Sequence, residues 1–205
     1  MTTSVPVTIY SESTPNPEAM KFVANMMLLR SGVKEYPDVD SASDSPLSQQ
    51  LFRFGGVKSI FITSNFITVT KHKDTDWFDI VNLIREFIRG YISSGDPVFS
   101  SEVSEIEKAN TDHVSPTTSE GHDEVLPEGE LEQKIVIALD EYVKPAVEQD
   151  GGAIHFKSFD NGIVTVILKG SCSGCPSSTV TLKSGIENLL TKMIPEVKEV
   201  VAESD

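Results

Sequence analysis

The chain has 205 residues, 39% of them hydrophobic, and a formal net charge of −14. This length fits two small domains or one large one, and the hydrophobic fraction is sufficient for a core. The negative charge argues against nucleic acid as a partner, because phosphate binding relies on clustered Lys and Arg. No apolar run approaches the length needed to cross a bilayer, which argues against a membrane partner.

The amino-terminal segment, residues 1–10, has no basic region followed by an apolar stretch. A secretory signal needs that pattern, and a mitochondrial transit peptide is rich in arginines, which this segment lacks as well. On these grounds the sequence predicts a cytoplasmic protein.

The first part of the chain, residues 1–99, predicts a domain of strands and helices. Strands are expected at 7–10 and 21–29, a short helix at 47–54, and a hairpin of strands at 57–62 and 66–70. A longer helix is indicated by apolar residues at helical spacing, namely Trp77, Ile80, Val81, Ile84, Phe87, Ile88 and Tyr91. Asp74, Thr75 and Asp76 offer N-caps for it, and Gly95 marks its end. This order predicts an α+β domain with helices on one face of an antiparallel sheet.

The next segment, residues 100–130, is poor in apolar residues and rich in Ser, Thr, Pro and acid. Ten acidic side chains and one lysine give residues 100–132 a net charge of −9. Such a segment cannot bury enough apolar surface to offset the entropy of ordering, so we expect an acidic, flexible linker. A short helix at 102–109 fits its pattern, and His113 and His122 are interpreted as solvated side chains, not as metal ligands.

The last part, residues 131–205, predicts a second small α+β domain. An apolar stripe over 131–143 indicates a helix that Pro145 should kink or end. Strands at 153–159 and 163–168 are joined by Asn161-Gly162, a strong hairpin signal. A helix that begins at Pro176 and a short strand at 197–201 complete the domain. The overall fold class is therefore α+β, with two small domains, each an antiparallel or mixed sheet with helices on one face.

The cysteines give the clearest chemical signal. There are two, Cys172 and Cys175, and two intervening residues let both sulfurs face one point. Pro176 is favoured at the first position of a helix, so the cysteines lie at or just before a helix amino terminus. The helix dipole and free backbone N–H groups there favour a thiolate or an anionic cluster.

Three interpretations of the pair remain open on the residues alone. A thioredoxin-like redox pair would expect a βαβ context, whereas a hairpin precedes these cysteines and small serines flank Cys172. A structural zinc site normally takes four protein ligands, and His155, on a strand, has no obvious reach. An iron–sulfur cluster is the third, against the simplest alternative of two buried cysteines that behave as small apolar side chains.

The number of sulfurs bears on the cluster interpretation. A four-iron cluster is usually held by four thiolates, and one chain supplies two. Two copies related by a two-fold axis would supply four. Such a shared site would lie at the surface and be labile, which suits a carrier that gives its cluster away.

Both parts of the chain resemble a known family. Asp150-Gly151-Gly152, the Asn161-Gly162 hairpin and the segment 170–190 resemble the NifU carboxy-terminal domain of the Nfu iron–sulfur scaffold proteins. Residues 13–22, 51–62 and 66–71 resemble the Nfu amino-terminal domain. The implied domains are an Nfu amino-terminal-like domain at 1–99, the linker at 100–130 and a NifU-like cluster-binding domain at 131–205.

The resemblance implies a scaffold or carrier that is not an enzyme. It would assemble a [4Fe–4S] cluster, or also a [2Fe–2S] cluster, across a homodimer and pass it to apo-proteins. The implied ligands are Cys172 and Cys175 only. The implied partners are a second copy when the cluster is loaded, apo iron–sulfur proteins as recipients, and upstream assembly proteins, with a monomer in the apo state.

Overall fold

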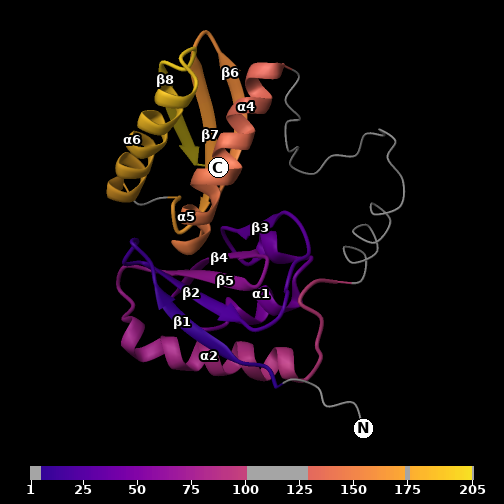
Figure 1. Ribbon diagram of the computed structural model, residues 1–205. Helices are drawn as coiled ribbons and strands as arrows, with labels where there is room; N and C mark the ends of the chain where they lie inside the picture. The colour runs from indigo at the N-terminus through magenta and orange to yellow at the C-terminus, as the bar shows by residue number, and fades with distance from the viewer. Residues whose placement is uncertain (1–5, 101–128, 174–175, 205) are drawn as a thin grey trace, which may run out of the picture. The chain divides into compact units, whose positions relative to one another are not determined.

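The computed structural model of the chain describes residues 6–100, 129–173 and 176–204 (Figure 1). The chain divides into two units, Met1–Pro116 and Thr117–Asp205. Residues 101–128 of the predicted linker, with the helix at 102–109 and both linker histidines, lie outside the described residues. The linker and the domain limits that depend on it therefore stay predictions.

The amino-terminal unit is an antiparallel sheet with helices on one face (Figure 1). Its five strands are arranged in the order β1-β2-β5-β4-β3, and all neighbouring pairs are antiparallel. The elements are β1 (Ile9–Ser13), β2 (Ala19–Ala24), β3 (Val33–Tyr36), η1 (Asp40–Ala42), α1 (Pro46–Leu51), β4 (Val57–Thr63), β5 (Phe66–Lys71) and α2 (Trp77–Ser93).

Helix α2 forms where its apolar spacing predicts it. The Asp76 side chain accepts a hydrogen bond from the Phe78 backbone N–H, which satisfies one of the free donors at the helix start. Gly95, with φ of +81°, follows the last turn. Ile84 and Ile88 are fully buried and pack in one core with α1 and the sheet. The predicted α+β class is confirmed for this unit.

The strands of this unit differ from the prediction in three places. One edge strand was not predicted, and two strands end at other residues than expected. Strand β3 was not predicted, because four residues with partial burial give too short a pattern. The predicted strand at 21–29 ends at Ala24, because the Asn25 side chain turns the chain by donating to the Pro6 carbonyl and accepting from Thr8 N–H. Strand β1 runs on to Ser13 instead of ending at residue 10, since its polar residues still pair with β2.

The carboxy-terminal unit is a second α+β domain, with a mixed sheet in the order β6-β7-β8. Strands β6 and β7 are antiparallel and β7 and β8 are parallel. Its elements are α4 (Glu130–Ala138), the π-helical η2 (Leu139–Val143), α5 (Lys144–Gln149), β6 (Gly152–Asp160), β7 (Ile163–Gly170), α6 (Pro176–Met193) and β8 (Glu199–Ser204). Asn161 and Gly162, with φ of +52° and +93°, form the predicted hairpin turn.

Pro145 does not end the first helix of this unit. Proline removes one backbone donor, and here the turn before it widens to a π-helix in which Lys144 N–H donates to the Leu139 carbonyl. The helical path then continues as α5 to Gln149. Leu139, Val143 and Val147 all remain buried in the core. Among the described helices, none has the length and apolar character to cross a membrane.

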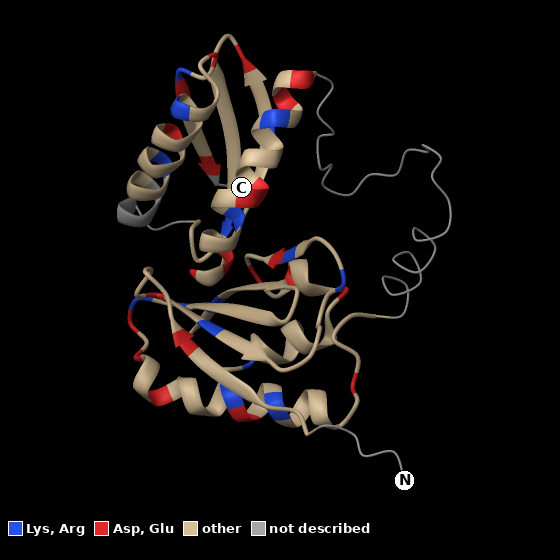
Figure 2. Cartoon of the chain, in the orientation of Figure 1, with Lys and Arg blue, Asp and Glu red and all other residues tan. Residues whose placement is uncertain are grey.

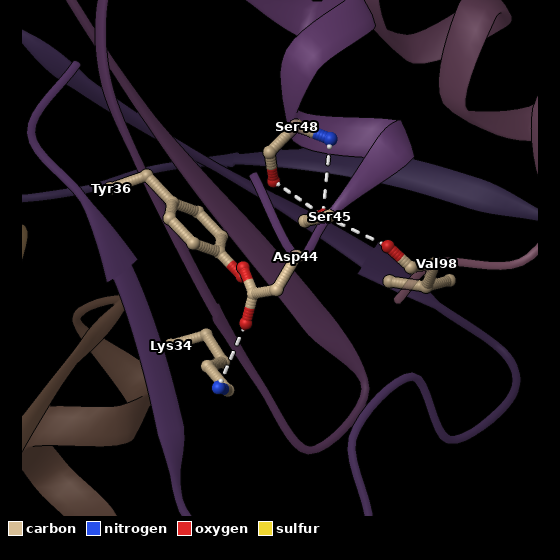
Figure 3. Close-up of polar contacts among 6 residues, drawn as sticks. All are labelled: Lys34, Tyr36, Asp44, Ser45, Ser48 and Val98. Atoms are coloured by element: carbon tan, nitrogen blue, oxygen red, sulfur yellow. Dashed lines mark hydrogen bonds and ion pairs between the residues drawn. The ribbon is translucent and has the colours of Figure 1, made fainter. Parts of the chain in front are cut away.

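A buried hydroxyl joins β3 to the loop before α1 (Figure 3). The Tyr36 hydroxyl donates to Asp44 Oδ1 at 2.7 Å, and Lys34 Nζ lies 2.9 Å from Asp44 Oδ2. Burial of Tyr36, the hydrogen bond and the negative charge of Asp44 raise the pKa of the tyrosine far above its usual range. Tyr36 therefore stays a hydrogen-bond donor.

The loop before α1 also forms hydrogen bonds with the segment that follows α2. Ser45 caps α1 by accepting from Ser48 N–H at 3.2 Å, and its hydroxyl donates to the Val98 carbonyl at 2.9 Å (Figure 3). Ser100 N–H donates to the Asp44 carbonyl at 2.8 Å. The end of the amino-terminal unit is thus fixed to its own core up to Ser100.

We predict that Asp44→Ala lowers the free energy of unfolding of the amino-terminal unit by about 1–3 kcal/mol, because it leaves the buried Tyr36 hydroxyl without its acceptor. Trp77 is the single tryptophan and lies in this unit, so its fluorescence during urea unfolding measures the effect. Asp40→Ala, the same change at an exposed acid of the same loop, should stay within about 0.5 kcal/mol of wild type. Equal losses in both variants would contradict the role given to Asp44.

Candidate functional site

The loop that connects β7 to α6 carries the cysteines. Strand β7 ends at Gly170, two residues beyond the predicted end at 168, and α6 begins at Pro176, as the sequence predicts. Cys172 lies in the described part of this loop. Cys175 lies outside the described residues, so the joint orientation of the two sulfurs stays a prediction.

The loop begins with a tight turn. Gly170 has φ of +69°, a conformation that glycine adopts without strain. The Gly170 carbonyl accepts from both the backbone N–H of Ser173, at 3.1 Å, and its hydroxyl, at 2.8 Å. Cys172 is therefore placed at the centre of a turn whose two ends are hydrogen-bonded to each other.

Two hydrogen bonds from Ser171 connect this turn to the segment between α5 and β6. Its backbone N–H donates to the Gly151 carbonyl at 3.2 Å, and its hydroxyl donates to the Asp150 carbonyl at 2.5 Å. The Ser171 side chain is buried, and its oxygen lies 3.7 Å from Cys172 Sγ. Residues about twenty positions apart in the sequence thus form one unit around the cysteine.

Cys172 itself is buried. Only 5% of its surface is exposed, and it belongs to the apolar core of the carboxy-terminal unit. A Cβ at Gly152 would lie 2.8 Å from Cys172 Sγ and 2.6 Å from the Lys169 carbonyl oxygen, closer than real contacts allow. The absence of a side chain at Gly152 is therefore what makes room for the sulfur. The expected surface position does not hold for this sulfur in the single chain, because the start of β6 packs against it.

The sequence analysis missed the roles of two neighbours of Cys172. Gly152 was named there only within the Asp150-Gly151-Gly152 resemblance, and Ser171 only as one of the small serines that flank Cys172. A Gly-Gly pair directly before a strand was the available signal for Gly152. No signal pointed to Ser171, whose partner lies 21 residues away in sequence.

His155 is not part of a metal site in the described chain. It lies half-buried on β6, where it pairs with Ile167. Within residues 6–100, 129–173 and 176–204, no three or more His, Cys, Asp or Glu side chains gather closely enough to hold a metal ion. Cys172 is a thiol four residues before a helix start, and that donor type and position suit an iron–sulfur group.

Comparison with known proteins identifies the family. The model of the Scaffold protein Nfu/NifU N terminal matches residues 9–95, and that of the NifU-like domain matches residues 135–201. The human protein named NFU1 iron-sulfur cluster scaffold homolog, mitochondrial, is 38% identical over 193 residues, which cover 94% of this chain and 70% of the relative. This chain belongs to the Nfu/NifU family of iron–sulfur cluster scaffold proteins.

Two further relatives of this Nfu/NifU chain match it over nearly its whole length. NifU-like protein 4, mitochondrial, of Arabidopsis thaliana is 37% identical, over 96% of this chain and 66% of the relative. The protein of Drosophila willistoni named NFU1 iron-sulfur cluster scaffold homolog, mitochondrial, is 37% identical, over 94% and 62%. The chain thus spans 62–70% of the length of these three relatives.

These names correct one prediction. The cytoplasmic location predicted from residues 1–10 is wrong, because the human, fly and plant relatives are all named mitochondrial. The physical reason is that a targeting segment acts before or during import and is then removed, so the folded domains of an Nfu/NifU chain need carry no trace of their compartment.

We predict that Gly152→Ala destabilises the carboxy-terminal unit by about 1–3 kcal/mol, since the new methyl group overlaps Cys172 Sγ and the Lys169 carbonyl. Calorimetry of the full chain measures the effect, and Trp77 fluorescence should show the other unit unchanged. Gly185→Ala is the matched control, because a Cβ there meets nothing within 4 Å on helix α6. It should stabilise the same unit by about 0.5–1 kcal/mol. A loss of stability in both variants would refute the specific contact at Gly152.

Proposed function

We propose that this Nfu/NifU protein assembles a [4Fe–4S] cluster between two copies of the chain and transfers it to apo-proteins. The observation that carries the proposal is the position of Cys172 in the loop directly before α6, in a chain of the scaffold family that has two cysteines. The cluster is cargo here, and the protein binds and releases it without acting as an enzyme.

The ligands in this proposal are Cys172 and Cys175 of each copy. Four thiolates complete a four-iron cluster, so loading requires a homodimer, and the apo chain is a monomer. A [2Fe–2S] cluster also takes four thiolates and is the alternative cargo of the same site. Because each copy contributes half of the ligands, separation of the copies releases the cluster without breaking the fold of either.

The partners follow from the chemistry of release. Apo-proteins with unfilled thiolate sites receive the cluster, and upstream assembly proteins supply it. Nucleic acid is not a partner in this proposal, because the chain is strongly acidic and its Lys and Arg residues are interspersed with Asp and Glu along the chain in both units (Figure 2). No membrane partner is proposed either.

The burial of Cys172 adds a requirement. With 5% of its surface exposed, the residue cannot ligate a cluster shared with a second copy in its present place. Loading therefore includes a local rearrangement of the loop that starts at Gly170. Such a step is local, since the hairpin of β6 and β7 and the helix packed on it need not change.

We predict that Cys172→Ser and Cys175→Ser each lose the cluster, while wild type binds about two iron and two sulfide per chain after anaerobic reconstitution. Iron, sulfide and zinc are measured together with the sedimentation of the loaded protein, which should be a dimer. Ser173→Ala keeps both sulfurs and should bind as wild type does. Undiminished iron in both cysteine variants, stoichiometric zinc in wild type, or metal-free disulfide reduction as its activity would each overturn the proposal.

A further inference from the structure

The π turn in the first helical path of the carboxy-terminal unit changes which residues face the core. Helix α4 buries Ala138, and regular helical spacing would put Tyr142, four residues later, on the same buried face. In the structure Tyr142 is 51% exposed, and Val143 is buried in its place. The turn holds one extra residue, because Lys144 N–H donates to the carbonyl of Leu139, five residues earlier. The π turn therefore moves the tyrosine out of the core.

This shift aligns Tyr142 with other exposed apolar residues. Ile137 is 62% exposed and, with one extra residue in the turn, lies one turn before Tyr142 on the same side of the helical path. Pro145 and Ala146 follow at the next helical spacing and are exposed as well. Single exposed apolar residues are ordinary, whereas a contiguous row of them is typical of an interaction site. We call the row of Ile137, Tyr142, Pro145 and Ala146 the helical stripe.

The stripe presents an uncharged aromatic ring. Pro145 accounts for the widened turn, because it lacks a backbone N–H, but it does not determine which side chain the turn directs outward. The residue directed outward is a tyrosine, and a hydrogen bond to Glu141 together with the negative charge of Glu141 raises the pKa of Tyr142. The phenol therefore stays neutral, and the ring can be buried against a partner without the cost of burying a charge.

The border of the helical stripe is acidic. The segments η2 and α5, residues 139–149, contain three acids, Asp140, Glu141 and Glu148, and one base, Lys144. Lys144 Nζ lies 3.4 Å from Asp140 Oδ1, so its charge is already paired within the chain. A second copy that docked stripe to stripe about a two-fold axis would bring like charges together. A partner that borders its own apolar surface with Lys or Arg would instead be attracted.

The stripe leads to the cysteine loop. Asp150 and Gly151 directly follow α5, and their carbonyls accept hydrogen bonds from Ser171, the residue before Cys172. The Asp150 N–H donates to the carbonyl of Ala146 at 3.1 Å, so this segment continues the backbone of the stripe. A partner that binds along the stripe is thereby held next to the cysteine loop.

We propose that the helical stripe is a docking surface for a partner protein whose apolar side chains are bordered by lysine or arginine, as on one face of a basic amphipathic helix. The docking itself requires no cluster. Its use, which is to bring the recipient of the cluster to the cysteine loop, rests on the proposed function.

The docking surface is tested with a fluorescently labelled helical peptide of leucine and lysine with one apolar face, about 18 residues or roughly five turns long. Its binding to the full apo chain is measured by fluorescence anisotropy. Ile137→Gln and Tyr142→Gln should each raise the Kd about five- to thirtyfold, because each removes apolar contact area and keeps a helix-forming residue. Phe78→Gln, the matched change at an 89% exposed residue of α2, should leave the Kd at the wild-type value.

A second peptide, with glutamate in place of lysine, separates charge complementarity from non-specific adsorption. It should bind at least about tenfold more weakly than the lysine peptide. Thermal unfolding of both stripe variants should stay within about 2 °C of wild type, because the replaced side chains are exposed. Absence of binding by the lysine peptide, equal affinity of the two peptides, an equal effect of Phe78→Gln, or a clear loss of thermal stability in the stripe variants would each overturn the proposal.

Sedimentation of the apo chain decides between a partner and a second copy. Wild type and Tyr142→Gln should sediment alike, and self-association of wild type that Tyr142→Gln abolishes would overturn the proposal in favour of a second copy. Both stripe variants keep both cysteines, so they should bind iron and sulfide as wild type does. If wild type takes up no cluster while the peptide results hold, the proposed function fails and the docking surface stands. A loaded cluster without peptide binding has the reverse meaning.

Discussion

The arrangement of the cysteine loop depends on one close approach, that of Cys172 to the backbone of Gly152. Any side chain at Gly152 would overlap both the sulfur and the Lys169 carbonyl. Gly152 also pairs with Gly170 at the start of the hairpin, so the strand register places the loop directly above it. The sulfur, the turn before β6 and the end of β7 are therefore packed against one another.

This constraint keeps the site within one unit. Asp150, Gly151 and Gly152 lie on one side of the loop, and Gly170 lies at its base, all in the carboxy-terminal unit. Both cysteines belong to the same unit. The amino-terminal unit has its own apolar core and contains no cysteine.

Much of the fold could be predicted because it depends on local signals. Helix α2 followed from apolar spacing and the Asp76 cap, and the hairpin of β6 and β7 followed from Asn161-Gly162. Strand β3 is a four-residue edge strand, too short to show a period. Pro145 predicted a kink or an end of the first helix, and the structure instead has a π-helical turn before it, with Leu139 and Val143 kept in the core.

The candidate site was predictable in position but not in environment. The spacing of the cysteines and Pro176 placed the loop before a helix, and α6 begins there. The burial of Cys172 was not foreseen, because it depends on a missing side chain at Gly152, twenty residues earlier in sequence. The hydroxyl partner of Ser171 is equally distant in sequence. Contacts of this kind are set by strand register, which motifs alone do not encode.

If Cys172 is a cluster ligand, as proposed, its burial changes how the cluster is released. If the sulfurs were exposed, access of solvent to the cluster would by itself make the cluster labile. In the proposed function, the closed loop around the buried Cys172 would compete with the cluster for the same sulfur, and the hydrogen bonds that close the loop would favour release. The stability of the apo arrangement, set by Gly152 and by the bonds of Ser171, then becomes part of the driving force for transfer. Such competition suits a scaffold that must both bind and release a cluster, because the affinity for the cluster can change while the ligands stay the same.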